Sequence, residues 1–288
     1  MKNILFIINP IAGKKAGRNI VKEIVKYLDT IRFKAYFRYS EYHGHISEIA
    51  AQALTEHFDV IIAVGGDGTV NETARILVHS EIALGIIPAG SGNGLARHLR
   101  IPLSVKGAVE RINKMYFLRM DAVRINNSYS FCVAGIGFDA KVSRMFQKME
   151  ARGLYSYIIA CLKCFNRSKN QNFIVKTETE EIVLNGFMLC FANASQFGNN
   201  AYIAPQASVS DGILNLILVR KPFLWQLPAL AIRILTGTVG KYSGWKELLG
   251  KEFEIRQKND YAHLDGEPKS IGSKFNVILE EKALQVIC

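Results

Sequence analysis

The sequence predicts two domains of different fold class: an α/β domain with a parallel sheet over residues 1–120, and a β-rich antiparallel sandwich with helical insertions over residues 121–288. Up to about residue 120, short apolar runs alternate with segments in which apolar residues recur every three or four positions, as in alternating strands and helices. After residue 121, strand-like runs follow one another, and turn signals separate them. A chain of 288 residues is long enough for two such domains.

The first domain is predicted from its uninterrupted apolar strands, because the strands of a parallel sheet are covered on both faces. Its first helix is expected around Ile20, Ile24 and Leu28, which recur every four residues. In chain order, the expected strands cover 4–8, 34–39, 60–64 and 84–87, and the further helices cover 46–57, 70–78 and a segment that begins at 94. This alternation predicts a parallel sheet with helices on both faces.

The second domain is predicted from strand-like segments at 122–133, 173–179, 181–192, 213–220, 252–257 and 274–280. Turn-forming pairs accompany them, namely Asn126-Asn127, Asn199-Asn200, Asp211-Gly212 and Asp265-Gly266. Two long segments, 141–169 and 222–250, break the series and are expected as insertions. Successive strands with few helices between them predict an antiparallel sandwich.

The positive charge of the chain is concentrated in these insertions. The net charge is +11, from 36 Lys and Arg residues against 25 Asp and Glu residues. Segment 141–169 holds seven basic residues, Arg152 among them, and one acidic residue, Glu150. Segment 220–251 holds six basic residues and one acidic residue, Glu247. Trp225 and Trp245 lie among the cations of the second segment, as interfacial aromatic residues do. A localised basic surface fits an anionic membrane or a nucleic acid, with a merely solvated face as the alternative interpretation.

Targeting signals and cysteine chemistry are not evident. The apolar start of the chain is too short for a signal peptide, and no segment approaches the roughly 20 apolar residues of a membrane span. The five cysteines are odd in number, and the pair Cys161 and Cys164 lies in an apolar, helix-like run, which favours buried thiols over a metal or redox site. A reducing, cytoplasmic location is therefore expected.

Glycine-bearing loops follow three of the expected strands and open the helices after them: Asn9–Lys14, Gly65–Thr69 and Pro88–Gly94. In a parallel sheet all three lie at the carboxyl ends of the strands, where ligands bind. Glycine lets a phosphate approach the backbone closely, and a helix that begins there presents N–H groups and the positive end of its dipole. Three such loops on one edge predict a cradle for a polyphosphate.

Asp67 is the one acid among these glycines. Beside a triphosphate its carboxylate would be repelled unless a divalent cation lies between them or unless it handles the incoming hydroxyl, and both are roles found in kinases. A tight β–α turn is the alternative explanation, because Gly and Asp are ordinary turn formers. The chain has no GxxxxGK[ST] segment and no GxGxxG after its first strand, which excludes a Walker-type P-loop and the dinucleotide-binding fingerprint.

Four motifs together resemble the catalytic-domain family of diacylglycerol kinases, which includes bacterial soluble lipid kinases and the sphingosine and ceramide kinases. The motifs are Asn9-Pro10-x-x-Gly13, Gly65-Gly66-Asp67-Gly68-Thr69-Val70-Asn71-Glu72, Ile87-Pro88-Ala89-Gly90-Ser91-Gly92-Asn93 and Leu264-Asp265-Gly266-Glu267. They occur in the family's order and span most of the chain. The GGDG segment alone is less specific, because NAD kinases and phosphofructokinases share it, and it implies a first domain similar to theirs.

The resemblance implies a two-domain kinase that depends on ATP and Mg²⁺, with ATP between the domains and a lipid that enters from the second one. It implies that Asp67 belongs to the magnesium-linked acidic network, and that Asp265 is the general base on the lipid hydroxyl. An Asp-Gly pair between strands is also the ordinary signal of a hairpin turn. The resemblance further implies that Asp211 would belong to a structural magnesium site, as in bacterial members, with a plain turn as the alternative. The residues implied in nucleotide binding are Asn9, Gly13, Gly65, Gly66, Gly68, Thr69, Glu72, Gly90, Ser91, Gly92, Asn93 and Glu267.

The identity of the lipid stays open at this point. Many diacylglycerol kinases carry an Asp after the Asn of the third loop, whereas this chain has Gly94. A small residue after GSGN is more similar to the sphingosine kinases. Asp139 lies near the position where that family reads its lipid head group, and a loop-capping role is an equally good interpretation. Diacylglycerol, which would give phosphatidic acid, is the leading substrate, and a sphingoid base is the second.

Two rival functions belong to other classes: an NAD-kinase-like enzyme with a soluble substrate, and a non-catalytic module that binds acidic lipid. The Asp67 and Asp265 pair argues against the module, because binding alone needs no base. The expected partners are ATP, a lipid substrate and, peripherally, an anionic membrane surface. Nucleic acid is not expected as a partner, and a homodimer is left open.

Overall fold

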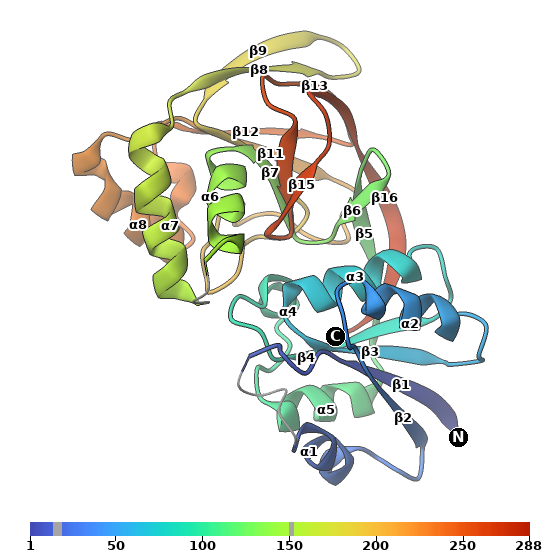
Figure 1. Ribbon diagram of the computed structural model, residues 1–288. Coiled ribbons are helices and arrows are strands. Elements are labelled where there is room, and N and C mark those ends of the chain that lie inside the picture. Colours follow the sequence, from blue (N-terminus) through green and yellow to red (C-terminus); the bar gives the residue numbers. More distant parts are fainter. Residues whose placement is uncertain (14–18, 150–152) are drawn as a thin grey trace. The chain divides into compact units, whose positions relative to one another are not determined.

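The computed structural model describes residues 1–13, 19–149 and 153–288 (Figure 1). Their internal contacts divide the chain into unit one, Met1–Met120 with Lys282–Cys288, and unit two, Asp121–Glu281. The sequence analysis assigned 282–288 to the second domain. In the structure these last residues belong to unit one, because the strand that holds them pairs with a unit-one strand at Val286 and Leu84. Lys14, Glu150 and Arg152 lie outside the described residues.

Unit one is a parallel sheet covered by helices on both faces. The strand order is β2-β1-β3-β4 followed by the end of β16, and these pairings are parallel. Helices α2 and α3 cover one face, and α1 and α5 cover the other (Figure 1). The elements are β1 (Lys2–Ile8), α1 (Ile20–Tyr27), β2 (Phe33–Tyr39), α2 (His45–Ala53), β3 (Val60–Gly65), α3 (Asp67–Leu77), β4 (Ala83–Pro88), α4 (Gly94–His98), α5 (Val105–Lys114) and the end of β16 (Lys274–Ile287).

Burial explains the composition of these elements. Every residue of β3 and β4 is buried, so both strands are apolar throughout instead of alternating. The helices bury one face each, through Ile20 and Ile24 in α1 and through Val109 and Ile112 in α5. Each fully buried aliphatic side chain of this kind contributes about 1.5–3 kcal/mol. The unit-one core therefore follows from two sequence patterns: continuous apolar runs in the strands, and apolar residues three or four positions apart in the helices.

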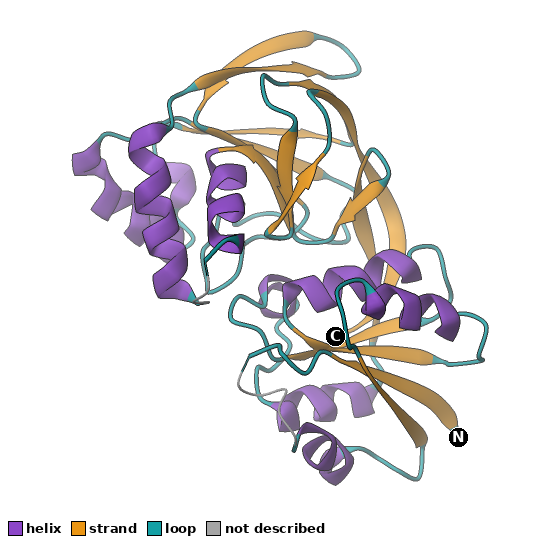
Figure 2. Ribbon diagram, viewed as in Figure 1, coloured by secondary structure: helices purple, strands orange, loops and turns teal. Residues whose placement is uncertain are grey.

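Unit two is an antiparallel sandwich (Figure 2). One sheet has the order β12-β11-β10-β7-β14-β15, and the other contains β9, β8, β13, the beginning of β16 and the β5–β6 hairpin. A single buried cluster draws on both sheets, with Ile136, Leu216, Phe173 and Val277 among its members. The elements are β5 (Phe117–Ile125), β6 (Ser128–Ser130), β7 (Val133–Gly137), α6 (Phe138–Gln147), α7 (Leu154–Arg167), β8 (Gln171–Lys176), β9 (Glu181–Gly186), β10 (Met188–Ala192), β11 (Leu214–Val219), η1 (Leu224–Gln226), α8 (Leu227–Leu235), η2 (Val239–Lys241), β12 (Trp245–Gly250), β13 (Glu252–Arg256), β14 (Tyr261–Leu264) and β15 (Glu267–Ser270).

The predicted fold class, an α/β unit followed by an antiparallel β unit, is confirmed. The details differ in several places. Helix α5 and strands β7, β14 and β15 were not expected, and the expected strand 122–133 covers parts of the β5–β6 hairpin. The expected strand 181–192 is two strands, β9 and β10, which belong to different sheets. The second insertion ends earlier than expected, because Trp245–Gly250 forms the edge strand β12 beside β11. An edge strand has one neighbour and weak alternation of buried and exposed residues, so the sequence pattern does not reveal it.

The described residues contain neither a candidate membrane-spanning helix nor a disulfide. None of the helices in the described parts of the chain is long and apolar enough to cross a membrane. All five cysteines are free thiols, and Cys161 and Cys164 lie on α7. Burial raises the pKa of the Cys161 thiol to about 12, so the reactive thiolate form is scarce at neutral pH.

Candidate active site

The three glycine-bearing loops emerge at the carboxyl ends of β1, β3 and β4, which are adjacent strands of unit one. Backbone hydrogen bonds tie the loops to each other at their bases. The Asn9 N–H donates to the Val64 carbonyl at 3.1 Å, and the Ala89 N–H donates to the Gly65 carbonyl at 2.8 Å. The loops therefore start from one edge of the sheet, which is the usual ligand-binding edge of this architecture.

Glycine is required in these loops because their backbones touch. A Cβ atom on Gly13, whose φ is +65°, would lie 2.2 Å from the Ala89 carbonyl oxygen. Gly66 and Gly90 pass each other closely, since a Cβ on Gly90 would lie 2.5 Å from the Gly66 Cα and one on Gly66 would lie 3.2 Å from the Gly90 Cα. The sequence analysis explained the glycines by space for phosphate. The structure adds a second reason, which is the packing of loop against loop.

Asp67 joins the second loop to the third. It is the first residue of α3, and its Oδ2 accepts a hydrogen bond from the Asn93 N–H at 2.8 Å while its Oδ1 accepts one from the Gly94 N–H at 2.6 Å. Gly92 leaves room for the carboxylate, because a Cβ there would lie 2.7 Å from Oδ2. The carboxylate thus holds the start of the helix after the third loop, which is a structural role in addition to any chemical one.

Side-chain amides close the individual loops. The Asn93 Nδ2 donates to the Gly90 carbonyl at 2.9 Å, and its Oδ1 accepts from the Gly90 N–H at 3.0 Å, so one side chain fixes the third loop as a compact turn. The Asn9 Nδ2 donates to the Thr69 Oγ1 at 3.3 Å and links the first loop to the second. Asn93 and Thr69 are buried. These motif residues therefore shape the cradle.

Arg97 is a candidate that the sequence analysis missed. It lies on α4, and its Nε donates to the Gly92 carbonyl at 3.0 Å, which places a guanidinium beside the third loop. Arginine is well suited to phosphate because its planar fork offers several donors. The available signal was a basic residue one helical turn after the GSGN segment.

The remaining predicted nucleotide residues lie in three different places. Gly65 ends β3 and Gly68 lies in the first turn of α3, while Ser91 is exposed in the third loop. Glu72 lies further along α3, where its Oε2 accepts a hydrogen bond from the Ser47 Oγ of α2 at 3.3 Å. Glu267 belongs to unit two, as the exposed first residue of β15. The structure thus brings most of the predicted nucleotide residues together, with Glu72 directed to α2.

Asp265 and Gly266 form the two-residue turn between β14 and β15. Their φ values are +50° and +88°, as a hairpin turn of the primed type requires. The hairpin interpretation is therefore part of the answer, but the carboxylate has contacts of its own. Its Oδ1 accepts from the Ser130 Oγ at 2.6 Å and the Cys132 N–H at 2.9 Å, and its Oδ2 accepts from the Phe131 N–H at 2.9 Å. Three donors from the link between β6 and β7 fix its direction.

Asp211 lies in an Asp-Gly turn beside the fully buried Asp121. Its Oδ1 accepts from the Ile213 N–H at 3.0 Å, and the Gly212 N–H donates to the Asp121 Oδ2 at 2.9 Å. Across the described residues no three His, Cys, Asp or Glu side chains gather into a metal-binding group. Mg²⁺ usually binds through one or two carboxylates plus water and substrate phosphates. The described residues around Asp211 therefore hold no preformed cage of three such side chains.

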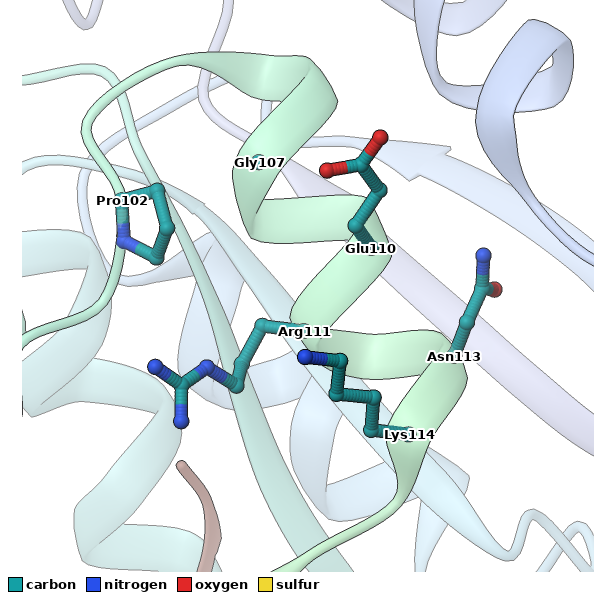
Figure 3. A pocket seen from close by; sticks show the side chains of 6 residues that line it. All are labelled: Pro102, Gly107, Glu110, Arg111, Asn113 and Lys114. Carbon is teal, nitrogen blue, oxygen red and sulfur yellow. The ribbon is translucent and has the colours of Figure 1, made fainter.

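A surface depression beside α5 is separate from this arrangement (Figure 3). Its described lining does not include any residue of the three loops, Asp211 or Asp265. The lining residues are Pro102, Gly107, Glu110, Arg111, Asn113 and Lys114. We therefore do not assign this depression to the nucleotide.

Comparison with known proteins identifies the family. The model of the diacylglycerol kinase catalytic domain matches residues 3–125, and the model described as "YegS C-terminal NAD kinase beta sandwich-like domain" matches residues 132–288. Two curated proteins named "Probable lipid kinase YegS-like" are similar to this chain over 99% of its length and 96% of theirs. The protein from Yersinia enterocolitica serotype O:8 is 29% identical, and the one from Yersinia pestis strain Pestoides F is 28% identical.

Solved structures share the fold over the same length. A crystal structure of a diacylglycerol kinase from Bacillus anthracis strain Sterne has a TM-score of 0.74 and 18% identity. A structure titled "A putative diacylglycerol kinase from Bacillus anthracis str. Sterne" has a TM-score of 0.78 and 20% identity. Each covers 99% of this chain and 96% of the other, and at this identity the likeness shows the fold alone. The two family models together match nearly the whole chain, and the second alone matches more than half of it. The chain therefore belongs to the YegS-like lipid kinases, phosphotransferases that join a diacylglycerol kinase catalytic domain to a β-sandwich-like domain.

Proposed function

We propose that this lipid kinase depends on ATP and Mg²⁺ and transfers the γ-phosphoryl group to the hydroxyl of diacylglycerol, giving phosphatidic acid. The observation that carries the proposal is the set of three mutually packed glycine loops at one edge of unit one, with Asp67 joining two of them. Backbone N–H groups and the N-terminal end of the 11-residue helix α3 lie at that edge, which suits a triphosphate.

Magnesium enters the proposal with the nucleotide. Asp67 is the residue that would hold it, and the ion would supply positive charge that neutralises the transferred phosphoryl group. Asp67 is held in place by the Asn93 and Gly94 N–H groups, each of which donates to one of its carboxylate oxygens. Arg97 is the nearby cation that we add to the nucleotide-binding residues, because it already contacts the third loop. Asp211 remains in the proposal as a secondary, structural cation site.

The acceptor half of the reaction belongs to unit two. Asp265 would take the proton of the lipid hydroxyl as the bond to phosphorus forms, which is what a poor nucleophile requires. Three donors fix its carboxylate before any substrate binds, and such preorganisation lowers the barrier of a transfer reaction. Glu267, two residues further on, is proposed to assist the nucleotide side.

The helical insertions of unit two are proposed to contact the membrane that holds the lipid. Trp225 is 76% exposed, whereas Trp245 donates its indole N–H to the Ile203 carbonyl at 3.0 Å and is half-buried in β12. The two tryptophans therefore differ in role, and only Trp225 suits an interface. Other exposed apolar side chains on α7, on α8 and on or directly before η1 are Tyr155, Tyr157, Ile158, Leu162, Phe223, Leu224, Ile232 and Leu235. Together with the exposed lysines of these segments they form a surface typical of peripheral membrane helices.

The experiment that tests the function is turnover of radiolabelled ATP against separate substrates, with EDTA as the metal control. We expect transfer to diacylglycerol that stops when EDTA removes Mg²⁺. Transfer to a sphingoid base instead would favour the sphingosine-kinase interpretation, to which Gly94 points. Transfer to NAD would favour a soluble-substrate kinase. Binding to acidic vesicles without any transfer would reduce the protein to a lipid-binding module.

A further inference from the structure

The turn that carries Asp265 is held by side chains that the proposed reaction does not use. Both backbone polar groups of Gly266 are bound by side chains. Its N–H donates to the His263 Nδ1 at 3.2 Å, and its carbonyl accepts from the Ser143 Oγ of α6 at 2.5 Å. Strand β15, which follows the turn, pairs with β14 alone and is mostly exposed. The turn is therefore held by these two side chains in addition to β14 and the contacts of Asp265 itself, whose N–H donates to the Val133 carbonyl at 3.1 Å and whose carboxylate binds the β6–β7 link.

His263 is in turn held by a buried carboxylate. Its Nε2 lies 3.1 Å from the Asp139 Oδ2. Because Nδ1 accepts the Gly266 N–H, the ring hydrogen of the neutral imidazole is on Nε2 and is donated to Asp139. The same carboxylate accepts from the Cys190 thiol at 3.2 Å and from the Ala140 N–H at 2.8 Å. A carboxylate behind a histidine fixes its tautomer and ring orientation, as it does behind the histidines of metal sites.

The fold makes special room for this pair. His263 and Asp139 are 3% and 5% exposed. Gly135 of β7 lies opposite His263 in the β7–β14 pairing, and a Cβ there would lie 1.9 Å from the Asp139 Oδ2 and 3.0 Å from the His263 Nε2. Burying a carboxylate carries a desolvation cost, and a hairpin turn can form without a buried carboxylate beside it. The loop-capping interpretation of Asp139 is thus replaced by a role in a buried polar network.

The network also fastens α6 to the strand before the turn. Asp139 and Ser143 lie one helical turn apart on α6, and they bind His263 and Gly266. A third contact comes from Arg144, whose guanidinium lies 4.4 Å from the centre of the Tyr261 ring in β14. Three successive features of one helix therefore contact the β14–β15 hairpin.

We propose that His263 is a positioning residue for Asp265. Asp139 orients its imidazole, and the imidazole and Ser143 hold the Gly266 peptide groups. These contacts fix the left-handed backbone of the turn, so that the Asp265 carboxylate stays within reach of its three donors. The inference rests on the proposed role of Asp265 as the general base. A base misplaced by about an ångström can cost as much as a hundredfold in rate, so a device that fixes the turn has a direct effect on turnover.

The test compares His263→Leu, which removes both ring hydrogen bonds, with His263→Asn, whose Oδ1 takes the place of Nδ1 and still accepts from the Gly266 N–H. Val175→Ala is the matched control, because Val175 is a fully buried core residue on β8, which does not pair with β14. We expect His263→Leu to lower kcat about tenfold or more with the KM for ATP unchanged within about twofold. His263→Asn should restore most of kcat, and Val175→Ala should lower Tm and leave kcat nearly unchanged.

Hydrogen exchange supplies a readout that does not depend on turnover. The amides of residues 264–267 should exchange faster in His263→Leu than in Val175→Ala, and His263→Asn should restore their protection. If His263→Leu does not fold, Ser143→Ala tests the same turn through the Gly266 carbonyl and should lower kcat in the same direction by less. Equal kcat in the Leu and Asn variants, or unchanged exchange at the turn, would overturn the proposal. Wild-type protein that phosphorylates no lipid would refute the proposed function, while the exchange comparison would still decide whether His263 holds the turn.

Discussion

Two Asp-Gly pairs, Asp67-Gly68 in unit one and Asp265-Gly266 in unit two, are alike in sequence and differ in structure. Asp67 opens a helix at the end of a parallel strand, whereas Asp265 lies in the left-handed region, with φ of +50°, between antiparallel strands. The dipeptide is the same, so the difference comes from the elements on either side. A parallel strand needs a crossover helix, and an antiparallel pair can be joined by two residues.

The two acids share one feature that the sequence did not reveal. Each carboxylate accepts backbone N–H groups from another segment, Asn93 and Gly94 for Asp67, and Phe131 and Cys132 for Asp265. Each is thus a link between segments as well as a candidate for chemistry. The comparison teaches that the two acids should fail in different ways when changed: Asp67 through the nucleotide loops, and Asp265 through the acceptor side.

The largest effect is expected from Asp265→Asn. Loss of the proton acceptor should lower kcat by about 10²–10⁴, while ATP binding persists because the nucleotide loops belong to unit one. Kinetics with diacylglycerol and direct titration with ATP measure the two quantities. An Asn variant that kept turnover within a few-fold of wild type would end the assignment, and Asp67 would become the candidate base.

Asp67→Asn should affect the nucleotide loops of unit one instead of the acceptor side. An amide offers only one acceptor oxygen, so either the Asn93 or the Gly94 N–H meets an NH₂ group, at a cost of about 1–3 kcal/mol for the lost hydrogen bond. We expect weaker ATP binding and a higher Mg²⁺ requirement, measured by titrating ATP at several Mg²⁺ concentrations. The same Mg²⁺ dependence in both Asn variants would show that the two acids are not separated in this way.

Three glycine variants sharpen the comparison by mechanism. Gly90→Ala places a Cβ against the Gly66 backbone, so it should cost about 1–3 kcal/mol of stability through overpacking and should weaken ATP binding. Gly66→Ala should do the same less strongly, because its Cβ has 3.2 Å instead of 2.5 Å. Gly266→Ala meets no atom within 4 Å, but its φ of +88° should cost about 1–2 kcal/mol and leave ATP binding intact. Thermal unfolding and ATP titration of all three variants check this order.

The smallest effect is expected from charge reversal at the end of the second insertion and on the neighbouring strand β12. Lys241 and Lys246 are exposed, whereas Lys251 is ion-paired with Glu281 and is left unchanged. Lys241→Glu with Lys246→Glu should weaken flotation with anionic vesicles, most clearly at low salt, because exposed charges are screened. Lys22→Glu with Lys26→Glu on α1 changes the net charge equally and serves as control. Equal flotation of both double variants would mean that the insertion is merely solvated.

The sequence predicted the fold from periodicity, and the structure confirms the class. It also predicted three loops on one edge. Strands as apolar as β3 and β4 indicate a parallel sheet covered on both faces, and neighbouring parallel strands end at the same edge. It did not predict β12, because an edge strand shows little alternation, or the return of residues 282–288 to unit one, because strand pairing over such a distance leaves no local pattern. The assignments of individual site residues remain predictions.

The sequence by itself determined where tight turns and buried strands lie, because glycine, aspartate and apolar period act over a few neighbouring residues. Only the tertiary structure decided what each polar group contacts. Three contacts join residues far apart in the chain. Gly90 packs against Gly66, Asp67 accepts hydrogen bonds from the third loop, and His263 is hydrogen-bonded to Asp139. Such contacts depend on how layers pack in three dimensions, and buried polar groups must find partners wherever the packing places them.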